Sequence, residues 1–243
     1  MKKKQKLMKK EGKTMLMQEE REQIVEYGKK MSADRLTSGT SGNISIYNAE
    51  KGYMAISPSG IGYFDVKPED VVIMDLDANI VDGDKKPSSE WALHTAMYKT
   101  KPECRAVVHT HSMYCTVFAT LRQPLRAAHY VIADAGVDEV PCAPYCTYGT
   151  PELAKAASDT IGDSNAVLLA NHGMLACGGS LKSAYSLACG MEFCAELEYR
   201  TKTIGGPVYL SKEEMAEVLE SFKSYGQPKR KTNLSDNSHF KII

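Results

Sequence analysis

Short apolar runs separated by polar turns dominate the chain between residues 44 and 81. Ile44–Tyr47 alternates apolar and polar side chains, and Tyr53–Ser57, Val71–Asp75 and Asn79–Val81 are further short runs of this kind. A period of two is typical of a strand with one buried face, and short polar connections join strands into hairpins. This region therefore predicts an antiparallel sheet, not a series of alternating strands and helices.

Helical patterns flank this region and continue to about Tyr225. Three of the predicted starts carry capping residues: Ser88-Ser89, Thr150 before Pro151, and Ser211 with Glu214 as a capping box. The predicted helices are Gln18–Lys30, Ser88 to about Lys99, Ser112–Leu121, Ala154–Ile161, Leu181 to about Thr203, and Lys212–Tyr225.

Two more strands complete the predicted fold, at Ala106–His111 and Val167–Ala170. The fold class is α/β, with a single domain in which helices cover a mostly antiparallel central sheet. We expect this domain to span residues 17–226. A lysine-rich leader over residues 1–16, without the apolar segment of a signal peptide, is expected to be disordered, and the polar tail 227–243 to be flexible.

Composition narrows the function classes. The 243 residues are 43% hydrophobic and carry no formal net charge, so nothing indicates an electrostatic surface for nucleic acid. No apolar stretch approaches 18 residues, which argues against a membrane span. The seven cysteines are odd in number and scattered, and we expect reduced thiols in a cytoplasmic protein.

Three histidines are the strongest chemical signal. His109 and His111 end an apolar run, and residues two apart in a strand point to the same face, so both imidazoles would aim at one point. His172 follows a second apolar run sixty residues later. Three imidazoles with open positions are typical of a catalytic metal site, although a lone HxH is as often an ordinary pair of histidines.

Other candidates are weaker when taken one by one. Glu90 at a helix start is either an exposed carboxylate that stabilises the helix dipole or a general base near the metal. His94, four residues later, is expected to pack or to support the site more than to serve as a fourth ligand. Tyr130, Tyr145 and Tyr148 are structural by default. Three small-residue loops suit a phosphate only if they converge in space: Gly42-Asn43, Ser59-Gly60 and Ser88-Ser89.

Taken together, these motifs resemble the class II aldolase/epimerase family, and within it the bacterial enzymes that cleave L-fuculose 1-phosphate. The resemblance runs in register from about Glu22 to Gly226. The motifs that carry it are Gly42-Asn43, Ser57-Pro58-Ser59-Gly60, Pro87-Ser88-Ser89-Glu90-Trp91, the HTH pair, His129-Tyr130, Pro141-Cys142-Ala143-Pro144-Tyr145 and Asn171-His172-Gly173.

The resemblance implies a three-layer fold, a cyclic homotetramer with sites at subunit interfaces, and one Zn²⁺ per subunit. It implies that Glu90 acts as catalytic base and also ligates the metal, and that Tyr130 reaches a neighbouring site as acid. By the same resemblance, Tyr148 lies near the aldehyde pocket. The implied zinc ligands are His109, His111, His172 and Glu90, and the implied phosphate site is Gly42, Asn43, Ser59, Gly60, Ser88 and Ser89.

The activity implied is reversible cleavage of L-fuculose 1-phosphate, or a related ketose 1-phosphate, to dihydroxyacetone phosphate and L-lactaldehyde through an enediolate held by the metal. Alternatives are aldolases for 5-deoxyribulose or rhamnulose 1-phosphate, a methylthioribulose 1-phosphate dehydratase, and L-ribulose-5-phosphate 4-epimerase. Epimerases of this family carry an acidic residue in a T-H-A-D segment, where this chain has His129-Tyr130-Val131-Ile132. A non-catalytic, adducin-like scaffold should have lost metal ligands, whereas this chain keeps them.

Overall fold

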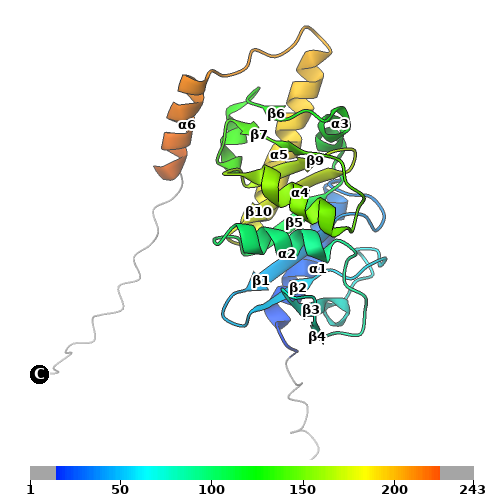
Figure 1. The fold of residues 1–243 in the computed structure, drawn as a ribbon. Coiled ribbons are helices and arrows are strands. Elements are labelled where there is room, and N and C mark those ends of the chain that lie inside the picture. Colours follow the sequence, from blue (N-terminus) through cyan, green and yellow to red (C-terminus); the bar gives the residue numbers. More distant parts are fainter. Residues whose placement is uncertain (1–14, 225–243) are drawn as a thin grey trace, which may run out of the picture.

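The predicted hairpins form half of one eight-stranded sheet in the computed structural model, which describes residues 15–224 (Figure 1). The strand order is β4-β3-β2-β1-β5-β10-β9-β8, and every neighbouring pair is antiparallel except β8 and β9. The strands are β1 (Asn43–Asn48), β2 (Tyr53–Ile56), β3 (Val72–Asp75), β4 (Ile80–Asp82), β5 (Ala106–Thr110), β8 (Cys142–Ala143), β9 (Ala166–Leu169) and β10 (Gly173–Gly178).

Helices cover both faces of the sheet, so the fold has three layers. Along β2, Ala55 packs in one core cluster with α1, α3 and α5, while Met54 and Ile56 pack on the opposite face with α2 and α4. The helices are α1 (Gln18–Ala33), α2 (Trp91–Thr100), α3 (Met113–Leu121), α4 (Pro151–Ile161), α5 (Leu181–Lys202) and α6 (Lys212–Ser224), with short 3-10 turns η1 (Pro68–Asp70) and η2 (Tyr130–Ala135).

The predicted architecture is confirmed, and most element boundaries agree within a few residues. Both predicted caps near the later helices are present: the Thr150 hydroxyl accepts from the Leu153 amide, and Ser211 and Glu214 bond each other's amide groups. The expected leader up to residue 14, the tail 227–243 and the predicted helix end at Tyr225 lie outside the described residues.

The predicted start of α2 is wrong. Ser88 and Ser89 do not cap the helix; the Ser88 amide donates to the Ser57 carbonyl, and Pro87 forms a bridge with Pro58. These contacts keep the segment extended against the turn after β2. The helix therefore begins at Trp91, and Glu90 occupies the N-cap position without making a side-chain capping bond.

Strand β10 was not predicted, although it pairs with β5 at the centre of the sheet. The apolar run before His172 and the run after it form a hairpin, β9–β10, rather than one strand and a loop. Asn171 makes the turn in the left-handed conformation, with φ of 56°. The short strands β6 (Leu125–Arg126), β7 (Glu139–Val140) and β8 were also not predicted.

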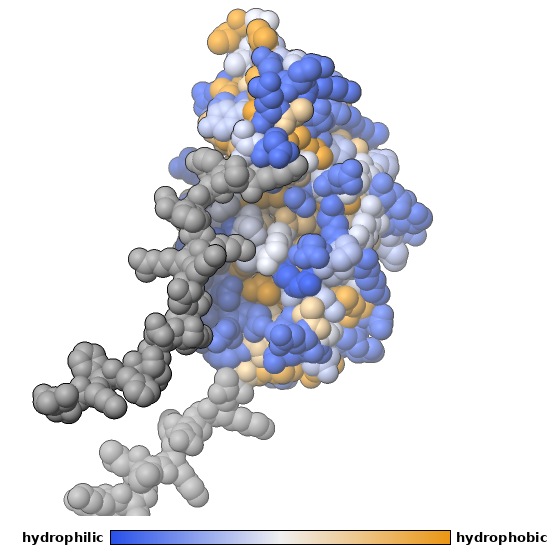
Figure 2. All heavy atoms as spheres, turned by 90° about the vertical axis from the view of Figure 1, so that its left-hand side faces the viewer, coloured by the Kyte–Doolittle hydropathy of each residue, from blue (hydrophilic) through white to orange (hydrophobic). Residues whose placement is uncertain are grey.

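Within residues 15–224, no helix is both long and apolar enough to cross a bilayer. Polar residues cover most of the face drawn in Figure 2. Hydrophobic residues lie at its upper end, where the connection between α5 and α6 lies in Figure 1, and in smaller groups near the middle and the lower edge. Ile204 and Val208 of that connection are almost fully exposed.

Candidate metal centre and substrate cavity

Strand β5 fixes the first two histidines. His109 lies at the middle of the sheet, opposite Asn43 of β1 on one side and Leu175 of β10 on the other. Its Nδ1 donates to the Met174 carbonyl at 3.0 Å, which leaves the Nε2 lone pair facing outward as a ligand atom. His111 follows the end of the strand, and its ring lies 4.9 Å from that of His109, as the same-face prediction requires.

The β9–β10 hairpin turn brings in the third histidine. The Asn171 amide donates to the Ala119 carbonyl at 2.9 Å, and the Arg122 guanidinium donates to the Asn171 side chain at 2.9 Å. These bonds tie the turn to the end of α3. The His172 ring consequently lies 4.8 Å from the ring of His109 and 4.9 Å from that of His111.

Glu90 completes a compact cluster with the three imidazoles. Its Oε2 lies 3.2 Å from His109 Nε2, and its Oε1 lies 3.4 Å from His172 Nε2. His109 Nε2 and His111 Nε2 are 3.0 Å apart. One ligand atom from each of the four residues lies within 4.8 Å of all the others, so the predicted metal ligands converge on one point.

Burial and mutual charge set the protonation of this cluster. Burial would raise the pKa of the Glu90 carboxyl, but the facing imidazoles of His109 and His172 outweigh it and hold that pKa well below its usual range. Burial, with repulsion from His109, lowers the pKa of His111 and of His172 to about 4. For His109, burial is outweighed by the Glu90 carboxylate, and its pKa is raised. Neutral His111 and His172 and an ionised Glu90 are the forms that bind a metal.

The donor set fits a divalent metal ion. Glu90 Oε1 and His172 Nδ1 are buried atoms without a hydrogen-bond partner among the described residues, and a cation held by the cluster would satisfy the carboxylate oxygen. Three imidazoles and one carboxylate are ligands of Zn²⁺ and of similar transition metals. The cluster can therefore bind a metal ion.

A cavity of about 380 Å³ opens beside the cluster, and the three predicted small-residue loops meet in its wall. Gly42 and Gly60 have φ of 72° and 73°, which glycine adopts without strain. A Cβ on Gly42 would lie 2.8 Å from the His109 carbonyl oxygen. Only glycine therefore lets this loop lie so close to the metal-binding strand. The lining includes every residue of the predicted phosphate site: Gly42, Asn43, Ser59, Gly60, Ser88 and Ser89.

The family model of the Class II Aldolase and Adducin N-terminal domain matches residues 22–199 of the chain. The chain belongs to the class II aldolase family. A 5-deoxy-D-ribulose 1-phosphate aldolase from Bacillus thuringiensis serovar kurstaki is 50% identical over 213 residues, which cover 88% of this chain and 100% of that relative. An L-fuculose phosphate aldolase from Escherichia coli O6:H1 is 41% identical over 205 residues, or 84% of this chain and 94% of the relative.

Solved structures agree with this assignment. An L-fuculose 1-phosphate aldolase structure matches with a TM-score of 0.84 and 44% sequence identity, covering 87% of this chain and 100% of the other. Both of these relatives and this solved structure are named as aldolases of sugar phosphates.

The two predicted tyrosines of this class II aldolase lie in different places. Tyr148 is 68% exposed and lines the cavity together with Tyr145 and Cys146, two residues that sequence reasoning did not place there. Tyr130 does not line the cavity. It is 51% exposed at the start of η2, where its ring stacks on His129 at 4.5 Å and lies 6.4 Å from that of Phe222.

His94 is not a member of the metal cluster. It is completely buried behind Asn43, whose side chain it contacts through Nε2, and its Nδ1 is 2.6 Å from the Ser45 hydroxyl. This placement agrees with the expectation that His94 supports the site. Thr40, Ser41 and Asn171 also line the cavity, and only proximity in the folded chain reveals them.

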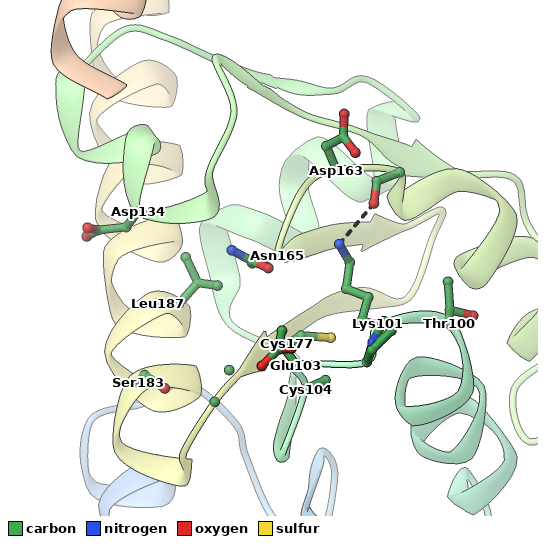
Figure 3. A pocket seen from close by; sticks show the side chains of 14 residues that line it. Thr100, Lys101, Glu103, Cys104, Asp134, Asp163, Asn165, Cys177, Ser183 and Leu187 are labelled. Carbon is green, nitrogen blue, oxygen red and sulfur yellow. Dashed lines mark hydrogen bonds between the residues drawn. The ribbon is translucent and has the colours of Figure 1, made fainter. Parts of the chain in front are cut away.

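A larger cavity of about 650 Å³ lies at the other end of β10, away from the metal cluster (Figure 3). Cys104, Cys177 and Asp134 line it, and Lys101 donates from its ammonium group to the Gly162 carbonyl across it at 2.9 Å. None of the four cluster residues reaches this cavity, so size alone does not identify the reactive site of a class II aldolase.

Proposed function

We propose that this protein is a metal-dependent aldolase that cleaves a ketose 1-phosphate to dihydroxyacetone phosphate and a short aldehyde. The observation that carries the proposal is the position of Glu90. This carboxylate belongs to the metal-binding cluster and also lines the cavity whose walls carry the hydroxyl and glycine loops. A base, a metal site and a phosphate-sized polar pocket are what cleavage beside a carbonyl group requires.

His109, His111, His172 and Glu90 would hold the ion, which we propose to be Zn²⁺ because imidazoles predominate. When bound, such an ion supplies a Lewis acid that polarises the substrate carbonyl. The ionised Glu90 carboxylate takes or returns the proton at the carbon that carries the hydroxyl group. In the synthetic direction, the electron pair of the broken C–H bond moves toward the carbonyl oxygen and then forms the C–C bond to the aldehyde carbon, whose oxygen takes a proton. Cleavage runs these steps backwards: that C–C bond breaks, the aldehyde leaves, and the proton returns to the carbon.

The loop residues of the cavity are proposed to hold the phosphate group. The Ser59 and Ser89 hydroxyls make no hydrogen bond with any described residue and border the cavity, so they are free to donate. The Ser88 hydroxyl accepts from the Glu90 amide at 3.3 Å, which links this wall to the base. No Lys or Arg is among the described lining residues, so hydroxyl and backbone donors would carry the recognition.

Tyr130 is proposed as the acid that protonates the aldehyde oxygen in the site of a neighbouring copy. Its half-exposed ring lies outside the cavity of its own chain, which supports a contribution across a subunit interface. The homotetramer expected from the family resemblance would provide that interface. Within such an assembly, each cavity would be completed by a second chain.

Two sugar phosphates are the leading substrates. The relative that is 50% identical is named for 5-deoxy-D-ribulose 1-phosphate, and relatives near 40% identity are named for L-fuculose phosphate. Both would give dihydroxyacetone phosphate, but the first releases acetaldehyde and the second L-lactaldehyde. The aldehyde would face the wall formed by Tyr145, Cys146 and Tyr148.

The test is metal-dependent release of dihydroxyacetone phosphate from four substrates: 5-deoxyribulose, L-fuculose, L-rhamnulose and D-ribulose 1-phosphates, with His111→Ala as the inactive control. We expect release from one or both of the first two, lost on chelation and in the variant. Release from another substrate alone would keep the mechanism and change the substrate. No release from any, with metal bound, would contradict the aldolase proposal.

A further inference from the structure

A chain of buried polar side chains runs from Glu90 into the protein interior. The Asn43 Nδ2 group donates to Glu90 Oε2 at 3.0 Å, and the Asn43 Oδ1 atom meets His94 Nε2. His94 Nδ1 is 2.6 Å from the Ser45 hydroxyl, which in turn contacts the Tyr98 hydroxyl. All five residues are buried, and they come from β1, α2 and the segment before α2.

Hydrogen-bond chemistry allows only one direction along this chain. A carboxylate only accepts, so the Asn43 NH₂ group must face Glu90 and the amide oxygen must face His94. His94 therefore carries its proton on Nε2, and its Nδ1 accepts from the Ser45 hydroxyl, whose oxygen accepts from Tyr98. Burial lowers the pKa of His94 to about 3, which keeps the imidazole neutral as this arrangement requires.

The chain distinguishes between the two oxygens of Glu90. Oε2 is held by Asn43, whereas Oε1 is buried without a hydrogen-bond partner among the described residues. A fixed amide on one oxygen sets the rotation of the carboxylate about its last bond. It also leaves Oε1 as the oxygen that would ligate the metal and, once substrate takes its place there, accept a proton from substrate.

We propose that His94 is a positioning residue for this aldolase: its Nε2–H group orients the Asn43 amide, which in turn orients the Glu90 carboxylate so that Oε1 acts as the base. The inference rests on the proposed function of Glu90. When a side chain that orients a metal-binding residue without touching substrate is removed, activity typically falls by roughly 10- to 100-fold.

Two substitutions at His94 separate this role from packing. Glutamine places an NH₂ group near the position of Nε2 and can still donate to Asn43, whereas asparagine places a polar atom near Nδ1 and can bond only Ser45. Both are amides of comparable polarity. We expect His94→Gln to keep kcat within about threefold of wild type, and His94→Asn to lower kcat by about tenfold or more.

In His94→Asn, KM and metal content should stay near wild-type values, because the loop hydroxyls and the three histidine ligands are untouched. The rate at which dihydroxyacetone phosphate exchanges its proton with D₂O should fall in parallel with kcat. A second matched pair removes one buried hydroxyl each: Tyr98→Phe, at the end of the chain, and Tyr185→Phe, whose hydroxyl donates to Asp34 elsewhere. Only the first should lower kcat.

Equal losses of kcat in the Gln and Asn variants would overturn the proposal. So would a change confined to KM or to metal content. The imidazole itself gives a test that does not need activity. In ¹⁵N-histidine spectra of the metal-loaded protein, His94 should be the neutral tautomer protonated on Nε2, and protonation on Nδ1 or on both nitrogens would overturn the proposal. If the wild type cleaves no ketose phosphate while this tautomer is present, the proposed function fails and the hydrogen-bond chain stands.

Discussion

Gly173 and Thr110 approach so closely that a Cβ on Gly173 would lie 2.2 Å from the Thr110 carbonyl oxygen and 3.2 Å from the His111 ring. Gly173 begins β10 directly after His172, and Thr110 ends β5 directly before His111. The contact therefore joins the two segments that carry metal ligands, and the absence of a side chain at residue 173 sets their separation.

Gly173→Ala should damage both stability and metal binding. The added methyl group must push the strand ends apart, which we expect to lower the free energy of unfolding by about 1–3 kcal/mol and to weaken metal affinity. Urea unfolding and metal titration measure the two effects. Gly179→Ala is the control, because a Cβ there would lie 3.8 Å from its nearest neighbour, the Glu103 carbonyl. Equal behaviour of the two variants would contradict the account of this contact.

Metal loading should stabilise the protein through the four-residue cluster. A ligand that binds only the folded state at a hundred times its Kd adds about 2.7 kcal/mol, so Zn²⁺ added to chelated protein should raise Tm. His111→Ala should lose both the bound metal and this rise in Tm. His129→Ala, which removes an imidazole outside the cluster, should keep one metal per chain by elemental analysis. Full metal content in His111→Ala would argue against the assigned ligands.

Acid should destabilise the metal-free protein partly through His94. Its pKa is about 3 when folded and about 6.5 when unfolded, so between these values the unfolded chain binds more protons. Stability is therefore lost as pH falls from about 6.5 toward 3, by up to about 1.4 kcal/mol per pH unit from this one group.

His94→Gln cannot titrate, so its free energy of unfolding should fall about 2 kcal/mol less than that of the wild type between pH 7 and pH 5. Urea unfolding of both metal-free proteins at the two pH values gives the comparison. The same fall in both proteins would mean that His94 is not the buried neutral imidazole described here.

Tyr63 should affect phosphate affinity without touching substrate. Its buried hydroxyl donates to the Gly42 carbonyl at 2.8 Å behind the cavity wall, and Gly28 leaves room for its ring. Because one hydrogen bond is worth about 1 kcal/mol, Tyr63→Phe should raise KM, and the inhibition constant of inorganic phosphate, by about fivefold with little change in kcat. Tyr53→Phe, on β2, serves as the control. A change in kcat alone would contradict this role.

Two of the four metal-cluster residues could be placed together from the sequence, because they lie close together in one predicted strand. The spacing of His109 and His111 on one strand face follows from the period of a β-strand, and the ring separation in the structure agrees. His172 and Glu90 join them only through the pairing of β5 with β10 and the extended segment before α2. The sequence raised His172 as a third histidine after an apolar run and Glu90 as one of two readings, and the family resemblance then assigned both as ligands.

The errors share a physical cause. Ser88 and Ser89 are good capping residues, but tertiary bonds to Ser57 and Pro58 override that preference and move the helix start to Trp91. The left-handed turn at Asn171 likewise divides one apolar stretch into two strands. The hydrogen-bonded side chains from Glu90 to Tyr98 are 47 to 53 positions apart in sequence at each contact, and only the fold brings them together.

The most direct test of the central claim is proton exchange of dihydroxyacetone phosphate in D₂O, followed by ¹H NMR with metal-loaded wild type and Glu90→Gln. If Glu90 is the base beside the metal, one of the two hydrogens on the hydroxymethyl carbon should exchange with the wild type. That exchange should stop on chelation and slow by at least about 100-fold in the variant. Exchange at the wild-type rate by Glu90→Gln with its metal bound would contradict the claim.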